Sequence, residues 1–212
     1  MKSDRLTDIS HEIRIDIARM FYKSGTGHFA PAMNNVRITG SDVPDDSSYE
    51  NAIAYLVRMF SAKKTQGACL FFIGNGGSAA IASHMTADYM KNGGLKTYSL
   101  YDNAVTTCMG NDYGYEYVFS RPLEFLGNKG DLLIAISSSG NSQNILNAIQ
   151  AARKNEMDVL TLTGFGEDNR VRQVGDCNIY IPNKRYGIVE NAHTVILQQV
   201  VDEIVKRDGV TL

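Results

Sequence analysis

The chain has 212 residues, of which 43% are hydrophobic and 21% are charged, an ordinary composition for a globular protein. A formal net charge of −2 at pH 7 argues against a dedicated nucleic-acid-binding protein. No apolar run is long enough to span a bilayer, and the start of the sequence does not resemble a signal peptide. The three cysteines are scattered and lack the spacing of a metal site, so we expect reduced thiols in a cytoplasmic protein without a membrane partner.

The first 48 residues divide into an expected helix and an expected loop. Between residues 5 and 22, apolar residues recur at helical spacing and form one stripe. Residues 23–48 contain Gly, Pro, Asn and Asp with little periodicity, which predicts a long loop, and loops of this length are often functional. His28 in this loop is either a surface residue or one that reaches a neighbouring subunit's site. We expect residues 1–48 to serve oligomerisation or to cover a site, beside a main domain of residues 49–212.

Beyond residue 48, short apolar runs alternate with segments of helical periodicity. The expected strands cover residues 69–73, 97–100, 131–136, 159–163 and 177–181. The expected helices cover residues 49–62, 78–88, 103–109, 115–126, 143–155 and 189–207, with a turn at residues 110–114. Continuous apolar strands between helices are typical of a parallel sheet covered on both faces. Right-handed crossovers then predict an α/β, doubly wound fold around a five-stranded parallel sheet.

The first expected strand runs into a glycine loop, Gly74-Asn75-Gly76-Gly77-Ser78, which is followed at once by a helix. Strand, glycine turn and helix is a layout in which backbone N–H groups and the helix dipole point at an anion. Ser78 is expected at the helix start, where its hydroxyl can cap the backbone or bind a ligand oxygen. The segment therefore indicates either a phosphate site or an ordinary tight turn between strand and helix.

A second polar loop follows the clearest buried strand of the sequence. Residues 137–142 read SSSGNS, so four hydroxyl groups and a glycine stand before a helix N-terminus. Hydroxyls and backbone N–H groups bind phosphate without a cation, whereas the alternative is a serine-rich turn capped by Asn141 or Ser142. Both loops are expected at the carboxyl ends of parallel strands, where open α/β sheets bind ligands. The pair favours a shared phosphate-binding site.

Four segments together resemble the sugar isomerase (SIS) domain proteins, namely IGNGGSAAIASHMTAD, GNDYGYEYVF, ISSSGNS and IVENAHTVI. The resemblance runs from about Tyr49 to Ile204. Within the family the sequence is most similar to the phosphoheptose isomerases, which interconvert sedoheptulose 7-phosphate and a heptose 7-phosphate. The resemblance implies a SIS-type, flavodoxin-like fold, a phosphosugar ligand, and a homo-oligomer, in many members a tetramer whose subunits share their sites.

The resemblance also implies which residues contact the phosphosugar. The serine loop would hold the phosphate, and Asn75 and Asp112 fall where the family contacts sugar hydroxyls. The full implied binding set is Asn75, Gly76, Gly77, Ser78, Asp112, Ser137, Ser138, Ser139, Ser142 and Gln198.

Aldose–ketose isomerisation through an enediol needs a base that removes a proton beside the carbonyl and an acid that protonates oxygen. His84 and Asp88 are four residues apart on an expected helix and therefore share a face. Glu190 and His193 lie near the start of the last helix, and Gln198 follows two turns after Glu190. We expect Asp88 to act as the base, with Glu190 or His84 as its complement, and His193 to orient or cap rather than to catalyse.

Three of these positions depart from the family pattern. Phosphoheptose isomerases usually carry glutamate at the position of Asp88, histidine at that of Gln198 and glutamine at that of Glu190. Aspartate is one methylene shorter than glutamate, and a displacement near 1 Å can cost on the order of a hundredfold in rate. Glutamine does not exchange a proton near neutral pH as imidazole does. The carboxylate of Glu190 is therefore a candidate substitute for the missing group.

Three further hypotheses involve these residues. His84, Asp88 and Glu190 could together hold zinc, as some members of the family do. The departures at Asp88 and Gln198 keep a second function open, a non-catalytic SIS module that binds a phosphosugar and regulates a partner. A third is an isomerase for a related phosphosugar, for example in a surface-polysaccharide pathway.

Overall fold

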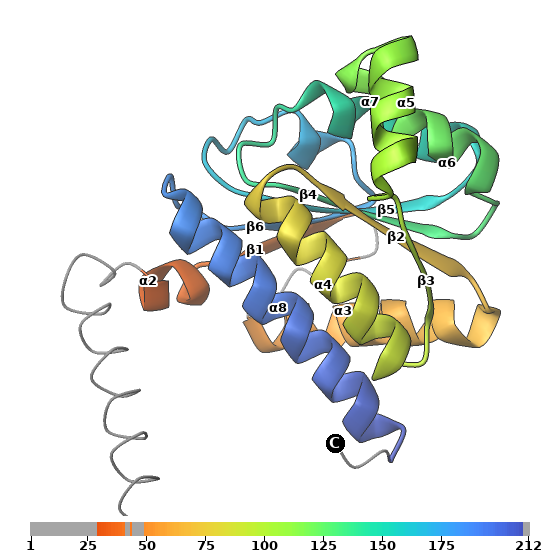
Figure 1. Ribbon diagram of the computed structural model, residues 1–212. Helices are drawn as coiled ribbons and strands as arrows, with labels where there is room; N and C mark the ends of the chain where they lie inside the picture. Colours follow the sequence, from red (N-terminus) through yellow and green to blue (C-terminus); the bar gives the residue numbers. More distant parts are fainter. Residues whose placement is uncertain (1–28, 41–42, 44–48, 210–212) are drawn as a thin grey trace, which may run out of the picture.

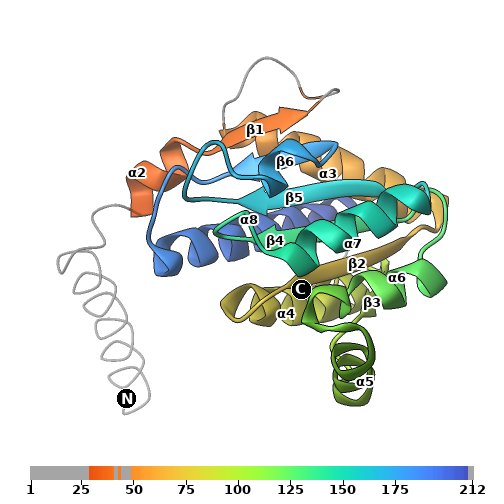
Figure 2. The same cartoon turned by 90° about the horizontal axis from the view of Figure 1, so that it is seen from above.

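The computed structural model describes residues 29–40, 43 and 49–209. The expected helix of residues 5–22 and His28 lie outside the described residues. The described chain forms three layers, with a central sheet between two sets of helices (Figures 1 and 2). Within this part of the chain, no helix combines the length and apolar character needed to cross a membrane.

The sheet has six strands in the order β1-β6-β5-β4-β2-β3. Their bounds are β1 Arg37–Gly40, β2 Cys69–Gly74, β3 Lys96–Ser99, β4 Leu132–Ser137, β5 Asp158–Thr163 and β6 Cys177–Tyr180. Strands β2 to β6 are parallel to their neighbours, as the sequence predicts, whereas β1 pairs antiparallel with β6. The expected count of five strands is therefore one too low.

The extra strand lies in the segment for which the sequence predicts a loop. Helix α2 (Phe29–Asn34) and strand β1 (Arg37–Gly40) occupy it, so the expectation of a loop is wrong for residues 29–40. Both elements are short, and β1 buries a single side chain, that of Ile38. A strand of four residues with one inward side chain leaves no periodic signal in the sequence, because its formation depends on pairing with β6.

Helices cover both faces of the sheet. One face carries α3 (Tyr49–Gln66), α4 (Gly77–Lys91) and α8 (Tyr186–Arg207), and the other carries α6 (Ser120–Leu126) and α7 (Gln143–Lys154) (Figures 1 and 2). Helix α5 (Asn103–Tyr113) projects from the layers and buries none of its residues (Figure 2). Two short 3₁₀ turns, η1 (Tyr115–Tyr117) and η2 (Val171–Gln173), complete the described elements. The expected helix of residues 115–126 is thus interrupted, and the expected turn at residues 110–114 is helical up to Tyr113.

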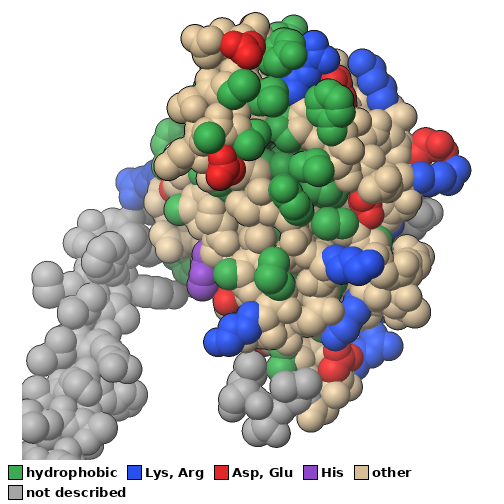
Figure 3. Space-filling model, turned by 45° about the vertical axis from the view of Figure 1, so that its right-hand side comes forward, with side chains coloured by type: hydrophobic (Ala, Val, Ile, Leu, Met, Phe, Trp, Pro, Cys, Tyr) green, Lys and Arg blue, Asp and Glu red, His purple; other side chains and the backbone are tan. Residues whose placement is uncertain are grey.

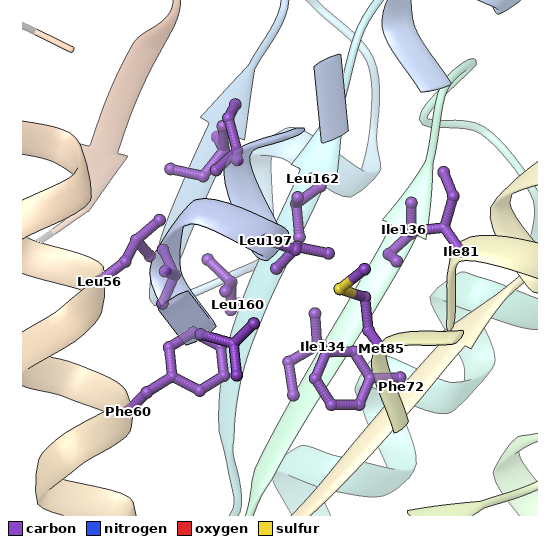
Figure 4. Packing of buried hydrophobic residues seen from close by; sticks show 14 of the residues in the cluster. Leu56, Phe60, Phe72, Ile81, Met85, Ile134, Ile136, Leu160, Leu162 and Leu197 are labelled. Atoms are coloured by element: carbon purple, nitrogen blue, oxygen red, sulfur yellow. The ribbon is translucent and has the colours of Figure 1, made fainter. Parts of the chain in front are cut away.

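The larger core lies between the sheet and the α3–α4–α8 face. Figure 4 shows Leu56 and Phe60 of α3 and Met85 of α4 directed toward sheet residues that include Phe72 and Leu160. Neighbouring strand residues point to opposite faces, so Phe71 enters the second core beneath α6 and α7. Burial on both faces explains why the strands read as continuous apolar runs.

Candidate functional site

The two polar loops meet at one edge of the sheet because β2 and β4 are adjacent parallel strands. Gly74 pairs with Ile136 in their register, so both chains leave the sheet side by side. Between them lies a cavity of about 270 Å³. It is lined by Asn75, Gly76, Gly77, Ser78, Ile136, Ser137, Ser138, Ser139, Ser142, Tyr186 and Glu190. The structure therefore brings together eight of the ten expected binding residues and one of the expected catalytic residues.

Tyr101 fixes the start of the glycine loop through two hydrogen bonds to Gly74. Its hydroxyl accepts from the Gly74 N–H at 2.6 Å and donates to the Gly74 carbonyl at 2.9 Å. Burial raises the pKa of this Tyr101 hydroxyl, so it stays protonated and keeps both bonds. Helix α4 begins after Gly76, which has φ 55° and, among the described residues, receives no capping side chain. Ser78 is the second residue of α4, at the helix start as expected, but Gly76 occupies the cap position. Of the two roles expected for the Ser78 hydroxyl, capping is therefore wrong, and binding of a ligand oxygen stays a prediction.

The serine loop presents donors that are not used elsewhere in the described chain. Ser138 is buried, and its Oγ has no hydrogen-bond partner among the described residues. Ser142 stands at the N-cap of α7, and within the described residues its side chain makes no capping bond. Ser137 accepts from the Gly140 N–H through its carbonyl at 3.0 Å and its Oγ at 3.2 Å. A ligand oxygen would satisfy the hydroxyl of Ser138 and the exposed N–H groups of the α7 N-terminus.

The cavity has the chemistry of an anion-binding site that is built from uncharged donors and bordered by one carboxyl group. Two helix N-termini, those of α4 and α7, open onto it, and the dipole of each favours negative charge. In α4 the N–H groups of Ser78 and Ala79 already donate to the carbonyls of Asn75 and Gly76, both at 3.0 Å. Among the described residues that line it, none is Lys or Arg, and Glu190 carries the single formal charge. Hydroxyls and backbone amides bind phosphate in this way without a cation.

Gly140 is the position at which the serine loop tolerates no side chain. Its φ is +66°, and a Cβ there would overlap the side chain of Asn169. We expect Gly140→Ala to lower the free energy of unfolding by about 1–3 kcal/mol, measured by urea denaturation. Gly130→Ala is the matched control, because Gly130 also has a positive φ, +85°, but faces open space. An equal loss in the two variants would contradict the overlap at Gly140.

Asn75 and Asn144 connect the two loops. The Asn75 Nδ2 donates to Asn144 Oδ1 at 2.9 Å, and the Asn144 Nδ2 donates to Asn75 Oδ1 at 2.8 Å. The Tyr115 hydroxyl also donates to Asn75 Oδ1, at 2.9 Å. The Asn75 side chain therefore links the glycine loop to the start of α7. Asn75 is the residue expected to contact sugar hydroxyls, but its Oδ1 already accepts hydrogen bonds from Asn144 and Tyr115. The sequence does not predict this role for Asn144, because its pairing with Asn75 spans 69 residues.

Glu190 approaches the glycine loop from α8. The Glu190 carboxylate lies so close to Gly77 that a Cβ at this position would overlap it, so the position requires glycine. Burial raises the pKa of Glu190, so this carboxyl keeps its proton to a higher pH than an exposed one and is a stronger base when ionised. Tyr186 also lines the cavity, although the sequence analysis does not predict it as a site residue. It lies one turn before Glu190 on α8, and its ring packs edge-on against Phe165 with centroids 4.7 Å apart.

His84 and Asp88 form a pair on α4, with Nε2 and Oδ2 3.3 Å apart. They do not line the cavity, but they lie seven and eleven residues after Gly77 and therefore on nearly the same stripe of the helix, about 10 and 16 Å along its axis. The His84 side chain is 59% exposed and that of Asp88 19% exposed. In the part of the chain that the structure describes, no three His, Cys, Asp or Glu side chains are grouped to hold a metal ion.

Two expected binding residues are engaged away from the cavity. Asp112, on α5, accepts from the Asn111 amide at 2.9 Å. Gln198, on α8, donates through Nε2 to Asp202 at 3.1 Å. The structure thus leaves Asp112 and Gln198 outside the group of residues that surrounds the cavity.

Comparison with known proteins adds to this geometry. The family model of the SIS domain matches residues 46–164. The chain is 35% identical over 167 residues to a phosphoheptose isomerase of Cytophaga hutchinsonii, covering 76% of this chain and 87% of the relative. It is 38% identical over 151 residues to that of Rhodospirillum rubrum, covering 68% and 80%. The solved structure of a phosphoheptose isomerase from Francisella tularensis superposes with a TM-score of 0.74 at 27% identity, covering 91% of this chain and 98% of the other.

Proposed function

The chain belongs to the SIS domain family, and from this premise we propose that it is a phosphosugar isomerase that interconverts an aldose phosphate and the corresponding ketose phosphate. The observation that carries the proposal is the cavity itself, in which the Ser138 hydroxyl, without a partner among the described residues, and two helix N-termini lie beside one carboxyl group. A sugar phosphate matches this chemistry, because its phosphate needs several donors and its carbonyl chemistry needs an acid or base. Sedoheptulose 7-phosphate is the proposed substrate, by likeness to the named relatives.

In the proposed complex, the phosphate lies between the glycine loop and the serine loop. The buried Ser138 Oγ then gains the partner that it lacks among the described residues. A hydrogen bond to a charged group contributes more than one between neutral groups, typically about 1.5–3 kcal/mol.

We therefore expect Ser138→Ala to weaken the binding of sedoheptulose 7-phosphate by about 10- to 100-fold, measured by isothermal titration calorimetry. Ser120→Ala is the control, because Ser120 is also buried but its Oγ donates to the Tyr117 carbonyl, away from the cavity. Equal affinities of the two variants would count against phosphate binding at Ser138.

The proposed chemistry uses two carboxyl groups, Asp88 on α4 and Glu190 on α8, of which Glu190 borders the cavity and Asp88 does not. Asp88 is the proposed base that removes the proton beside the carbonyl, and the enediol forms as an acid protonates the carbonyl oxygen. The pairing with His84 at 3.3 Å would hold the carboxylate of Asp88 in one orientation. Glu190 is the proposed second acid–base group, since burial raises its pKa and it borders the cavity.

Incubating the purified protein with sedoheptulose 7-phosphate and following the sugar by NMR tests this function. The expected result is appearance of the aldose phosphate. Tight binding without turnover would instead favour the second candidate, a phosphosugar-binding regulatory module. The observation that favours this alternative is that neither Asp88 nor Gln198 lines the cavity. Turnover of another phosphosugar alone would keep the reaction type and change the substrate.

Among the described residues, the three side chains expected to hold zinc are not grouped as a metal site. His84 and Asp88 are paired, but Glu190 is not grouped with them, and the described residues hold no cluster of three metal-binding side chains. We therefore derive no step of the reaction through zinc. Zinc binding by these three residues stays a prediction, and the metal content of the protein purified with and without added zinc tests it.

We also propose a homo-oligomer, a tetramer with shared sites. Large hydrophobic side chains are exposed on the side of β3, α5 and α6, among them Tyr98, Val105, Tyr113 and Phe125, the last of which is 82% exposed. Figure 3 looks toward this side and shows hydrophobic side chains gathered over its upper half. Exposed apolar patches of this kind are typical of surfaces that pack against another molecule. Light scattering tests the proposal, and a monomer mass would contradict it.

The cytoplasm is the proposed location. All three cysteines are free thiols, and Cys177 is buried where burial raises its pKa to about 12. Free thiols in these environments are typical of proteins that stay in a reducing compartment.

A further inference from the structure

His193 is a fully buried histidine on α8, three residues after Glu190 and outside the residues that line the cavity. Its Nε2 lies 3.2 Å from the carbonyl oxygen of Thr163, at the end of β5. A carbonyl oxygen can only accept a hydrogen bond, so the Nε2 of the neutral ring carries the hydrogen. The Nδ1 is then a buried lone pair, and it has no partner among the described residues.

The Thr163 carbonyl belongs to the same planar peptide unit as the N–H of Gly164. That N–H donates to the carbonyl of Ser138 at 3.1 Å. One rigid unit is therefore held by His193 at its oxygen and holds the serine loop at its nitrogen. The chain of contacts runs from the α8 side chain through a single peptide plane to the backbone of Ser138.

Other contacts fix the same unit from the sides. The Ile181 N–H also donates to the Thr163 carbonyl, at 2.9 Å. The next peptide unit, Gly164–Phe165, is held by Asn169, whose Nδ2 donates to the Gly164 carbonyl at 3.1 Å and whose side chain packs against Gly140 of the serine loop. His193 is the one member of this set that is a side chain from another layer of the fold, so it couples α8 to the loop.

We propose that His193 is a positioning residue that fixes the serine loop in its ligand-binding conformation through the Thr163–Gly164 peptide unit. The expected effect of His193 on phosphosugar affinity rests on the proposed function, whereas its effect on the conformation of the serine loop does not depend on any ligand. Burial also lowers the pKa of His193 to about 4, so the ring is neutral at physiological pH and keeps the same donor. A residue needed only to fill space would not require a ring nitrogen facing a carbonyl.

Two variants at this position separate the donor from the volume. His193→Met removes the hydrogen-bond donor and keeps a long apolar side chain, whereas His193→Gln retains an N–H donor near the ε position. Val201→Ala is the matched control, because Val201 is also fully buried on α8 but lies about 12 Å further along the helix. It is expected to lower overall stability without reaching the loop.

The first measurement uses no ligand and records hydrogen exchange of the Gly164 amide by NMR. We expect at least tenfold faster exchange in His193→Met, relative to amides of the β4 interior, and nearly unchanged exchange in His193→Gln and Val201→Ala. Unchanged protection in His193→Met, or equal loss in Val201→Ala, would overturn the positioning role. Should His193→Met fail to fold, the imidazole ¹⁵N shifts of the wild-type protein decide, since a hydrogen on Nδ1 instead of Nε2 would also overturn it.

The second measurement is the binding of sedoheptulose 7-phosphate and of inorganic phosphate by titration calorimetry, with kcat and KM where turnover occurs. We expect about tenfold weaker binding and a higher KM in His193→Met, little change in kcat, and rescue in His193→Gln. Wild-type affinity in His193→Met would overturn the consequence for binding. If the wild-type protein binds neither compound, the proposed function fails, and the exchange measurement still decides whether His193 positions the loop.

Discussion

Replacing Asp88 with asparagine is expected to lower kcat by about 10²–10⁴-fold while changing the affinity for sedoheptulose 7-phosphate little. Asparagine has nearly the same shape as aspartate but takes up no proton near neutral pH. Removal of a base that acts in the transition state lowers kcat and kcat/KM together. Steady-state kinetics of the two proteins, followed by NMR or by a coupled assay for the aldose phosphate, give both constants.

Asp88→Glu is the matched control for this prediction. It keeps the carboxylate and lengthens the side chain by one methylene, toward the residue that the phosphoheptose isomerases usually carry there. We expect it to retain turnover or to raise it, because the reacting group moves by about 1 Å while its chemistry is unchanged. Unchanged turnover in Asp88→Asn would show that another group is the base.

Glu190 is the residue to which the role would then pass. Its carboxyl borders the cavity and has a raised pKa, whereas Asp88 lies about 16 Å beyond Gly77 along α4. A parallel Glu190→Gln variant therefore distinguishes the two carboxyls. Loss of turnover in both variants would indicate that one acts as the base and the other as the acid, as expected for transfer of a proton between neighbouring carbons.

The sequence predicts the main features of the fold because they depend on local patterns. Five strands and most of the helices between them follow from apolar runs and helical spacing, and the structure confirms them, although β3 buries a single side chain, that of Thr97. The meeting of the two polar loops was predictable too, since adjacent parallel strands end at one edge of the sheet. Strand β1 was not predictable, because four residues with one inward side chain carry too little pattern.

The finer arrangement of the site depends on contacts between residues far apart in the chain. Tyr101 holds Gly74 across 27 residues, and Asn144 pairs with Asn75 across 69. Neither spacing nor composition indicates such pairs, so Asn75 was expected to contact sugar hydroxyls although its oxygen is occupied by protein donors. Resemblance to a family transfers positions, but the hydrogen bonds that a side chain already makes are visible only in the structure.

Acid is expected to destabilise the protein through His193. The pKa of an exposed histidine is 6.5, whereas burial lowers that of His193 to about 4. Between these two values the unfolded chain binds a proton that the folded chain excludes, so the free energy of unfolding falls as the pH falls through this window. The gap corresponds to a loss of about 3 kcal/mol on going from pH 7 to pH 4, and to no change above pH 7 from this group.

Urea denaturation of the wild-type protein and of His193→Gln at several pH values between 7 and 4 measures this loss. Carboxyl groups also titrate in the window, but they are common to both proteins, so the difference between the two stability curves isolates His193. We expect the wild-type curve to fall more steeply than that of His193→Gln below pH 6.5. Parallel curves would mean that the ring takes up its proton in the folded state. In that case the added proton would go to Nδ1, and the ring would not be the buried neutral group described above. The Nε2–H would still donate to the Thr163 carbonyl, so the hydrogen exchange of the Gly164 amide would decide the coupling between α8 and the serine loop.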